Sequence, residues 1–311
     1  MKGYLERVLP MVRDPRRMVN RLFTTSIFKC IPDSLYLKLV FRFKIGHRLD
    51  LKSPKTFNEK MQWLKLYDRN PLYSRLVDKY EVREYIENTI GGKYLIPLIG
   101  VYDSFDDIDF NELPNRFVLK CTHDSGGVVI CSDKSNFDLK AAKKRLNKCL
   151  RKNYYWSWRE WPYKSIRPRI ICEELLIEES GNELLDYKFM SFNGNVKCSF
   201  VCLNRKSPTG LNVDFYDMEW NPMPFERHYP SSGKKIAKPK NFDKMVKLAE
   251  KLSKGMPFIR VDFYEVNGRV YFGELTLYPG SGFEEFTPDS YDELLGNWIS
   301  LPLKNKFKGE N

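Results

Sequence analysis

Two acidic residues near the C-terminus have the types and spacing of a metal-binding pair. Asp262 and Glu274 lie on the two arms of an expected hairpin that turns at Asn267-Gly268, five positions before the turn and six after it. Asn-Gly steps favour tight hairpin turns, so the two side chains are expected to face each other on one sheet surface. Facing carboxylates repel unless a cation lies between them, and hard oxygen ligands suit Mg²⁺ bound together with substrate phosphates. The alternative is a solvated pair on an exposed hairpin.

The residues around this pair favour the metal interpretation. Both carboxylates lie in strongly apolar runs, RVDF and RVYFGELTL, where an unpaired charge is costly to bury. Arg260 precedes Asp262 by two positions and is expected on the same strand face. The run YPGSG follows directly and offers backbone N–H groups as an anion cradle.

A lysine followed by a glycine-bearing loop forms a candidate phosphate site. Lys120 ends the expected strand RFVLKC just before the loop THDSGG, in which Ser125, Gly126 and Gly127 allow backbone N–H groups to approach a phosphate closely. The patterns GxxxxGK[ST] and GxGxxG are absent, which excludes a P-loop and a dinucleotide fingerprint. An ordinary hairpin turn is the alternative.

The strand RIICEELLI carries two glutamates, Glu173 and Glu174, in an apolar segment that continues into Leu175 and Leu176. Because successive side chains of a strand point to opposite faces, one glutamate must point inward. An inward carboxylate beside free strand backbone can bind an adenine amino group. The alternative is an ion pair with a lysine such as Lys188.

The strands, hairpins and helices expected along the chain indicate an α+β fold with predominantly antiparallel sheet. The steps Asn193-Gly194 and Asn267-Gly268 each mark a hairpin. Helices are expected over 138–152 and over FDKMVKLAEKLSKG, and the first part of the chain reads as helical. The expected division is a helical region over residues 1–90, a first lobe with flap and hinge over 91–180, and a second lobe with the metal site over 181–311.

Length and composition indicate a globular protein. The chain has 311 residues, of which 42% are hydrophobic and 14% aromatic, enough for two or three lobes. No run of eighteen apolar residues occurs, and charges and prolines interrupt the N-terminus, so the sequence predicts a cytoplasmic protein without a membrane span or a secretory signal. Seven cysteines without a CxxC pair read as reduced, mostly buried thiols.

The formal net charge of +12 favours an anionic partner such as a nucleotide, an acidic sugar, a membrane surface or nucleic acid. The densest basic stretch, 140–152, has Ala142, Leu146 and Leu150 at helical spacing and reads as a solvated helix face. The segment RDPRRMVNR leaves peripheral membrane contact open. A nucleic-acid binder is not expected, because that function does not explain carboxylates in apolar strands.

Taken in order, these segments resemble the ATP-grasp superfamily, whose pattern is an early lysine, a lysine before a glycine flap, a hinge glutamate, then R-x-D and E-x-N before Pro-Gly. More narrowly, PKTFNEKMQWLKLYDRNPLYSRLVDKYEVR, REWPYKSIRPRIICEELL and DYKFMSFNG resemble the TupA-like ATP-grasp branch over about residues 50 to 290. The matching positions are Lys79, Lys120, Glu173, Arg260, Asp262, Glu274 and Thr276.

The resemblance implies an ATP-grasp fold, in which two antiparallel lobes clasp ATP, and the chemistry of an ATP-dependent carboxylate–amine ligase. Adenine would lie at the hinge from Glu173 to Leu176, and the phosphates would be held by Lys79, Lys120 and Lys188. Mg²⁺ would be held by Asp262, Glu274 and Thr276, and Arg260 with the amide of Gly280 would stabilise an acyl phosphate. Thr276 departs from the usual asparagine, which leaves open whether one or two magnesium ions bind.

The branch is associated with bacterial teichuronopeptide and capsule polysaccharide synthesis. The resemblance therefore implies a uronic acid of a polysaccharide, or of its precursor, as the carboxylate substrate and an amine such as an amino acid as the second substrate. The run NYYWSWREWPY, with Arg159 and Glu160, has a composition common where sugars bind, or it is a packed loop. A glycosyltransferase is the alternative function, with Asp107-Ile108-Asp109 as a candidate DxD motif in a polar run that reads more naturally as a surface cap.

Overall fold

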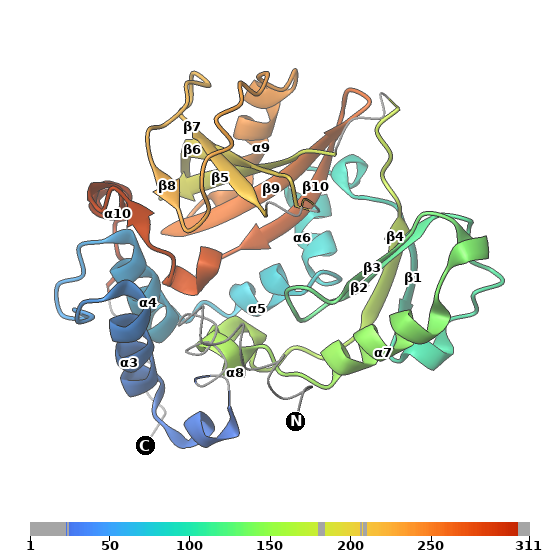
Figure 1. Ribbon diagram of the computed structural model, residues 1–311, viewed down its shortest axis with the longest axis horizontal. Helices are drawn as coiled ribbons and strands as arrows, with labels where there is room; N and C mark the ends of the chain where they lie inside the picture. Colours follow the sequence, from blue (N-terminus) through green and yellow to red (C-terminus); the bar gives the residue numbers. More distant parts are fainter. Residues whose placement is uncertain (1–22, 24, 180–183, 206, 208–209, 304–311) are drawn as a thin grey trace, which may run out of the picture.

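The computed structural model describes residue 23 and residues 25–179, 184–205, 207 and 210–303 (Figure 1). The basic segment RDPRRMVNR, for which membrane contact is left open, lies outside the described residues. Among the described helices, none is both long and apolar enough to cross a membrane. Five of the seven cysteines are buried and all seven are free thiols, as predicted.

A small antiparallel sheet forms the first lobe. Its strands are β1 (Leu98–Tyr102), β4 (Ile170–Glu174), β2 (Phe117–Cys121) and β3 (Val128–Cys131), in the order β1-β4-β2-β3. Helix α7 (Leu139–Leu150) covers this sheet and buries Ala142 and Leu146, while its lysines face outward as the spacing predicts. The loop THDSGG joins β2 to β3, which confirms the predicted hairpin.

A larger antiparallel sheet forms the second lobe, with strand order β10-β9-β5-β6-β7. Both Asn-Gly turns are confirmed: Asn193 (φ 50°) with Gly194 (φ 86°), and Asn267 (φ 50°) with Gly268 (φ 75°), lie in the left-handed region that two-residue hairpin loops require. Helix α9 (Phe242–Ser253) packs against β5, β6 and β9. The strand bounds are β5 (Asp186–Phe192), β6 (Asn195–Leu203), β7 (Asn212–Tyr216), β9 (Phe258–Val266) and β10 (Arg269–Thr276).

Helices near the start of the chain pack beside the large sheet (Figure 1). The second of them, α4, begins with a capping box in which Thr56 and Glu59 satisfy each other's backbone N–H groups. Asn58 then donates to both carboxylate oxygens of Asp292, through its backbone N–H and its side chain, and so joins α4 to α10. The helices are α3 (Asp33–Ile45), α4 (Phe57–Tyr67), α5 (Leu72–Val77), α6 (Val82–Thr89) and, near the other end, α10 (Ser290–Asn297).

The described residues form two hydrophobic cores. One core lies under the small sheet and includes Phe117, Leu119 and Leu146. The other joins the early helices to the large sheet through residues such as Phe57, which packs edge to face against Phe192 and Phe258. The predicted α+β class with antiparallel sheets is confirmed, and the two sheets stand apart as two walls. The remaining short elements are η1 (Ser26–Cys30), η2 (Gly92–Tyr94), η3 (Phe105–Asp107), η4 (Lys134–Asn136), α8 (Tyr155–Trp158), η5 (Trp161–Tyr163), β8 (Glu226–Arg227), η6 (Pro279–Gly282) and β11 (Phe286–Thr287).

Candidate active site between the two sheets

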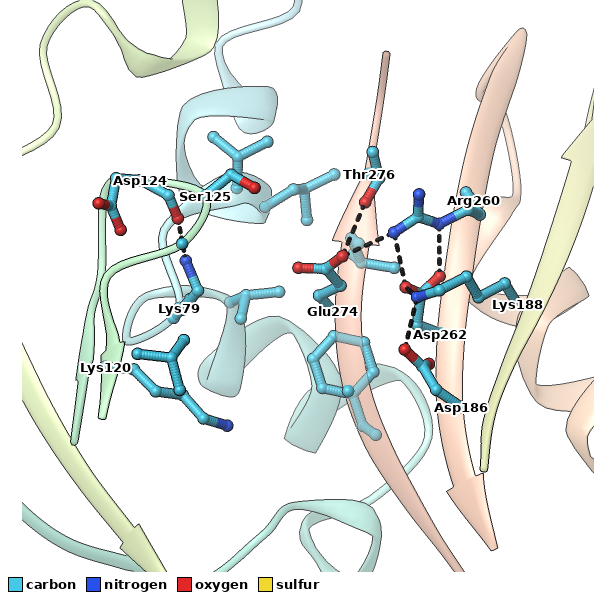
Figure 2. Close-up of a pocket in the computed structure, with 18 of the residues that line it drawn as sticks. Lys79, Lys120, Asp124, Ser125, Asp186, Lys188, Arg260, Asp262, Glu274 and Thr276 are labelled. Carbon is cyan, nitrogen blue, oxygen red and sulfur yellow. Dashed lines mark hydrogen bonds and ion pairs between the residues drawn. The ribbon is translucent and has the colours of Figure 1, made fainter. Parts of the chain in front are cut away.

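A cavity of about 670 Å³ lies between the two sheets and collects most of the predicted site residues (Figure 2). Those from the small lobe and its neighbouring turns face those from β5, β9 and β10 across the opening. The predicted residues that line it are Lys79, Lys120, Ser125, Gly126, Glu173, Lys188, Arg260, Asp262, Glu274, Thr276 and Gly280. The predicted residues that do not line it are Gly127, Glu174, Leu175 and Leu176.

The two carboxylates near the C-terminus are direct cross-strand partners, since Glu274 on β10 pairs with Asp262 on β9. Five residues before the turn and six after it would not match in a regular hairpin. A bulge between Phe272 and Glu274 absorbs the extra residue, Gly273. A Cβ atom at Gly273 would lie 3.1 Å from the carbonyl oxygen of Asp262, so glycine fits here with the least strain.

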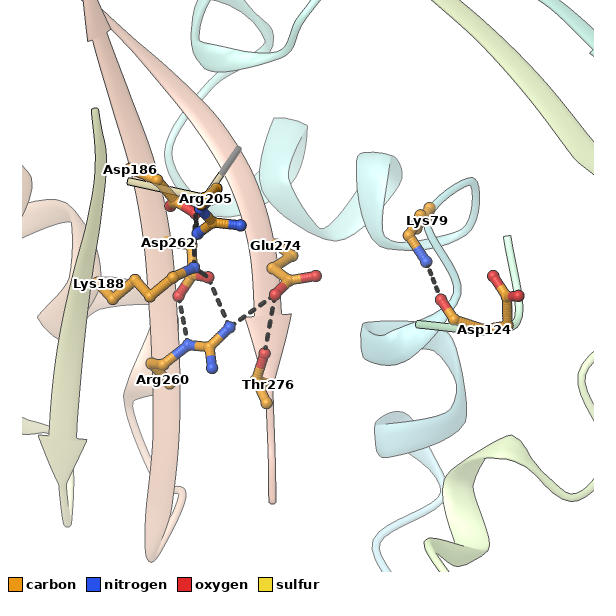
Figure 3. Close-up of polar contacts among 9 residues, drawn as sticks. All are labelled: Lys79, Asp124, Asp186, Lys188, Arg205, Arg260, Asp262, Glu274 and Thr276. Carbon is orange, nitrogen blue, oxygen red and sulfur yellow. Dashed lines mark hydrogen bonds and ion pairs between the residues drawn. The ribbon is translucent and has the colours of Figure 1, made fainter. Parts of the chain in front are cut away.

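Arg260 supplies the positive charge between the two carboxylates (Figure 3). Its Nε donates to Asp262 Oδ1 at 2.6 Å, and its Nη2 donates to Asp262 Oδ2 and to Glu274 Oε1, each at 2.6 Å. Thr276 donates its hydroxyl to Glu274 Oε1 at 3.4 Å. The prediction that Arg260 shares a strand face with Asp262 is confirmed.

Two further cations extend this network across β5. Lys188, opposite Asp262 in the sheet, donates to the Asp262 carboxylate and forms an ion pair with Asp186 at 2.7 Å. Arg205 reaches the same Asp186 oxygen at 2.7 Å. Three cations therefore meet three carboxylates on one wall of the cavity, and such pairing is what makes buried charge tolerable.

The charges of this wall shift the acidity of its carboxyl groups. Burial raises the pKa of Glu274, but the opposing charges of Arg260, Lys188 and Lys79 outweigh burial and bring it to about 2. The Glu274 side chain is 46% exposed at the cavity surface, so it is ionised and accessible at neutral pH. Burial also raises the pKa of Asp262, with Arg260 and Lys188 acting in the opposite direction.

On the opposite wall, the flap between β2 and β3 faces the carboxylates (Figure 2). Lys79 lies in the turn between α5 and α6 and donates to the backbone oxygen of Asp124. Gly126 has φ +114°, which places it in the left-handed region. Gly127 instead packs under the flap, where an added Cβ would lie 2.7 Å from the Asp124 carboxylate, so its role is in the turn.

Glu173 is the inward glutamate of β4, and Glu174 is exposed, as strand alternation requires. Glu173 accepts from Lys120 at 2.6 Å and from Arg83 at 2.9 Å. The alternative of an ion pair with a lysine is confirmed, but the lysine is Lys120; Lys188, the example given, belongs to the other sheet and pairs with Asp186 and Asp262. Strand β4 ends at Glu174, so Leu175 and Leu176 continue beyond the sheet.

Several residues that line the cavity were not predicted as site residues. Asp186 could have been found from the sequence, because it precedes Lys188 by two positions and so points to the same face of the strand. Nothing in the sequence around Arg83 indicates a site residue beyond its position on an early helix.

Asp124 and Ser281 lie in the loops THDSGG and YPGSG, which the sequence already marked as candidate phosphate and anion sites. Tyr154, Glu160 and Tyr163 lie in the aromatic run whose composition suggested sugar binding. Arg205 and Glu284 come from segments that sequence periodicity does not place near the site.

The aromatic run NYYWSWREWPY divides between packing and the cavity. Arg159 is fully buried and forms an ion pair with Asp33 at 3.1 Å, so that part of the run is a packed loop. Tyr154, Glu160 and Tyr163 line the cavity.

The candidate DxD motif, Asp107-Ile108-Asp109, does not line this cavity. Asp107 accepts a hydrogen bond from the Ser104 backbone at 2.9 Å and so caps a local turn.

The oxygen donors of the large-sheet wall fit a magnesium ion. Asp262, Glu274 and the Thr276 hydroxyl are hard ligands, and Mg²⁺ ordinarily takes one or two protein carboxylates and completes its shell with waters and substrate phosphates. No group of three or more His, Cys, Asp or Glu residues suited to a metal occurs within the part of the chain that the structure describes. Both Asp262 oxygens accept from Arg260 or Lys188, whereas Glu274 Oε2 accepts no hydrogen bond from the residues described.

Solved structures similar to this chain have low sequence identity. D-alanine–D-alanine ligase from Helicobacter pylori is 14% identical, with 79% of this chain and 69% of that chain covered and a TM-score of 0.42. N5-carboxyaminoimidazole synthetase from Staphylococcus aureus is 15% identical, with 73% and 53% covered and a TM-score of 0.40. D-alanine–D-alanine ligase from Bacillus anthracis, complexed with ATP, is 14% identical, with 72% and 63% covered and a TM-score of 0.38.

The chain thus spans 53% and 63% of the length of the Staphylococcus aureus and Bacillus anthracis proteins. No curated protein matches it significantly. The sequence model of the family described as TupA-like ATPgrasp matches residues 59–300, which is most of the chain. The protein therefore belongs to the TupA-like ATP-grasp family and has the two-lobed α+β fold of ATP-grasp proteins.

Proposed function

We propose that this protein is an ATP-dependent ligase that converts a substrate carboxylate into an acyl phosphate and transfers the acyl group to an amine. One observation carries the proposal: Asp262 and Glu274 face each other beside Arg260 on one wall of a cavity whose other wall carries Lys79 and the flap. This arrangement offers oxygen ligands for a metal ion and cations for phosphates on opposite sides of the same space.

ATP would lie between the sheets, with adenine at the hinge formed by Glu173 and the residues up to Leu176. Lys79, Lys120 and Lys188 would hold the phosphates, and the backbone of Ser125 and Gly126 would close over them. Magnesium held by Asp262, Glu274 and Thr276 would neutralise charge on the transferred phosphoryl group. Lys120 would leave its ion pair with Glu173 to reach a phosphate.

The substrate carboxylate would attack the γ-phosphate to give an acyl phosphate and ADP. Arg260 is placed to stabilise the charge that develops there, since its Nη1 donates to none of the residues that the structure describes while Nε and Nη2 are anchored. The amide of Gly280, which also lines the cavity, would act with it on the tetrahedral intermediate. An amine then displaces phosphate and an amide forms.

We also propose the substrate class and setting. The carboxylate is a uronic acid of a cell-surface polysaccharide or its precursor, as in capsule or teichuronopeptide synthesis, and the amine is an amino acid or a similar amine. The net charge of +12 favours an acidic glycan near the protein, in the cytoplasm or at the inner face of the membrane. The chain would divide into three parts: a helical support over residues 1–90, a lobe with flap and hinge over 91–180, and a lobe with the metal site over 181–311.

Product analysis tests the function directly. Purified protein is given ATP, Mg²⁺, a panel of uronic acids and a panel of amino acids, and the release of ADP and phosphate is measured for each combination. We expect ADP release that depends on the uronic acid, and a product mass equal to both substrates minus water. UDP release from a nucleotide sugar without ATP would instead establish a glycosyltransferase.

A further inference from the structure

A buried carboxylate at one end of the cavity forms no ion pair with the residues that the structure describes. Glu160 is only 5% exposed, yet it lines the cavity. Its Oε1 accepts from the Ser281 hydroxyl at 2.5 Å, and its carboxylate forms no ion pair with any residue within the described ranges. A charge removed from water ordinarily requires a partner of opposite sign. Burial raises the pKa of Glu160, and the charge of Lys65 and the hydrogen bond from Ser281 offset this only in part.

The nearest buried cation, Lys65 on α4, is held by other oxygen atoms. Its Nζ donates to the backbone oxygens of Ser281 at 2.7 Å and Trp158 at 3.0 Å, and to Gln62 Oε1 at 3.1 Å. Burial lowers the pKa of Lys65 to about 7, although the charge of Glu160 opposes this shift. Lys65 therefore fixes the η6 loop beside Glu160 without forming a contact pair with it.

Two tyrosines complete this end of the cavity. The rings of Tyr154 and Tyr163, which both line the cavity, are 4.8 Å apart in an edge-to-face arrangement at 62°. Both hydroxyls lie within electrostatic range of Glu160 and of Glu274. A carboxylate beside aromatic rings is a typical environment for an ammonium group, and this one adjoins the wall where the acyl phosphate would form.

We propose that Glu160, together with Tyr154 and Tyr163, binds the ammonium group of the amine substrate and accepts a proton from it before the amine attacks. This inference rests on the proposed ligase function and extends it to the second substrate. It assigns the incoming amine to the end of the cavity next to Ser281, one residue beyond the Gly280 amide.

The proposed step balances. The substrate enters as R–NH₃⁺ and gives one proton to Glu160 Oε2. The nitrogen lone pair then attacks the acyl carbon, the bond between that carbon and the phosphate oxygen breaks, and phosphate leaves with the bonding electrons. A second nitrogen proton goes to the departing phosphate, which leaves as HPO₄²⁻, and Glu160 returns its proton to water.

Hydroxylamine separates this role from the first half of the reaction. Hydroxylamine is largely uncharged at neutral pH and traps an acyl phosphate as a hydroxamate without requiring a base. We compare wild type and Glu160→Gln, using the uronic acid that gives the highest turnover in the panel, with hydroxylamine or with the best amino acid as nucleophile. Glu112→Gln, an exposed change outside the cavity, is the matched control.

We expect Glu160→Gln to lower amide formation by about 10² to 10⁴-fold, the usual contribution of a general base. Its KM for the amino acid should rise, whereas its KM for ATP and its rate of hydroxamate formation should stay within about threefold of wild type. Glu160→Asp should recover part of the lost amide formation. Retained hydroxamate formation also shows that the variant is folded.

The outcomes distinguish the two proposals. Equal loss of amide and hydroxamate in folded Glu160→Gln, or full retention of amide formation, would overturn the role of Glu160 and leave the ligase intact. Failure of wild type to release ADP or to form hydroxamate with every acid tested would overturn the ligase proposal and this inference with it. If Glu160→Gln does not fold, the double variant with Lys65→Met, which also removes the buried lysine, carries the same expectation.

Discussion

The two walls of the cavity hold their charged groups in different ways. On the large-sheet wall, Arg260, Lys188 and Arg205 interlock with Asp186, Asp262 and Glu274 so that most groups have two or more partners (Figure 3). On the small-lobe wall the contacts form two separate sets: Lys79 holds one flap carbonyl, and Lys120 and Arg83 both hold Glu173. The first wall is preorganised, and the second can exchange its partners for a ligand.

The backbone explains this difference. The charges of the large sheet sit in direct register on three neighbouring strands, the edge strand β10 and the inner strands β9 and β5. Lys188 lies opposite Asp262, Asp262 opposite Glu274 and Arg260 opposite Thr276. The flap is instead a loop outside the strand register, between β2 and the edge strand β3. Metal binding and phosphoryl transfer need fixed geometry, whereas nucleotide entry needs a flap that can move.

The largest effect is expected for Glu274→Gln. This change removes the Glu274 carboxylate, whose second oxygen, Oε2, accepts no hydrogen bond from the residues described and is a candidate metal ligand. Because Glu274 is 46% exposed, the change should affect activity more than folding. ADP release should fall about 10³-fold, as is usual for loss of a group that stabilises transition-state charge. Steady-state assays measure this, with Glu112→Gln as the control, and turnover near wild type would remove Glu274 from the metal site.

Asp262→Asn is expected to destabilise the fold more than any single change on the small-lobe wall. It removes the buried carboxylate that neutralises Arg260 and Lys188, which should lower the free energy of unfolding by about 3 kcal/mol. Glu173→Gln should cost only about 1 kcal/mol, because Lys120 and Arg83 are 19% and 16% exposed and remain partly solvated. Urea unfolding measures both, and equal losses would contradict the distinction between the walls.

Lys120→Ala is expected to weaken ATP use rather than stability. Because Lys120 is the penultimate residue of β2, beside the flap, and would contact phosphate, its loss should raise the KM for ATP about tenfold, equivalent to about 1.4 kcal/mol. Lys143→Ala, on the exposed face of α7, should leave this KM unchanged. If both substitutions raise the KM alike, the general positive charge of the protein would be responsible instead of a specific phosphate contact.

The smallest effect is a dependence of stability on pH. Because the pKa of Glu274 is about 2 in the folded protein against an ordinary 4.5, its ionised form favours folding above pH 4.5, and that contribution is lost as pH falls from 4.5 through 2. Glu274 is 46% exposed, so the contribution is about 1 kcal/mol or less. In magnesium-free buffer the stability difference between wild type and Glu274→Gln should shrink as pH falls from 5 to 2.5, and a constant difference would contradict the assignment.

Local chemistry in the sequence determined much of this protein. Asn-Gly steps specify two-residue turns and alternation specifies strand faces. These rules placed Arg260 and Asp262 on one strand face, put Glu274 on the facing arm of the same hairpin, and required one glutamate of the pair Glu173-Glu174 to point inward, whereas the bulge at Gly273 that aligns Glu274 with Asp262 was not predicted. They also specified the hairpin that carries Ser125 and Gly126. Each of these features depends on residues close together in the chain, so its geometry follows from strand and turn rules.

Only the tertiary structure decided how distant segments share the cavity. The sequence did not reveal that Arg260 itself bridges the two carboxylates, that Lys120 rather than Lys188 pairs with Glu173, or that Glu160 is buried without an ion pair to any described residue. The contact between Lys120 and Glu173 joins residues 53 positions apart, and the contact between Glu160 and Ser281 joins residues 121 positions apart. They depend on how the two lobes and the early helices dock, and no local periodicity encodes that docking.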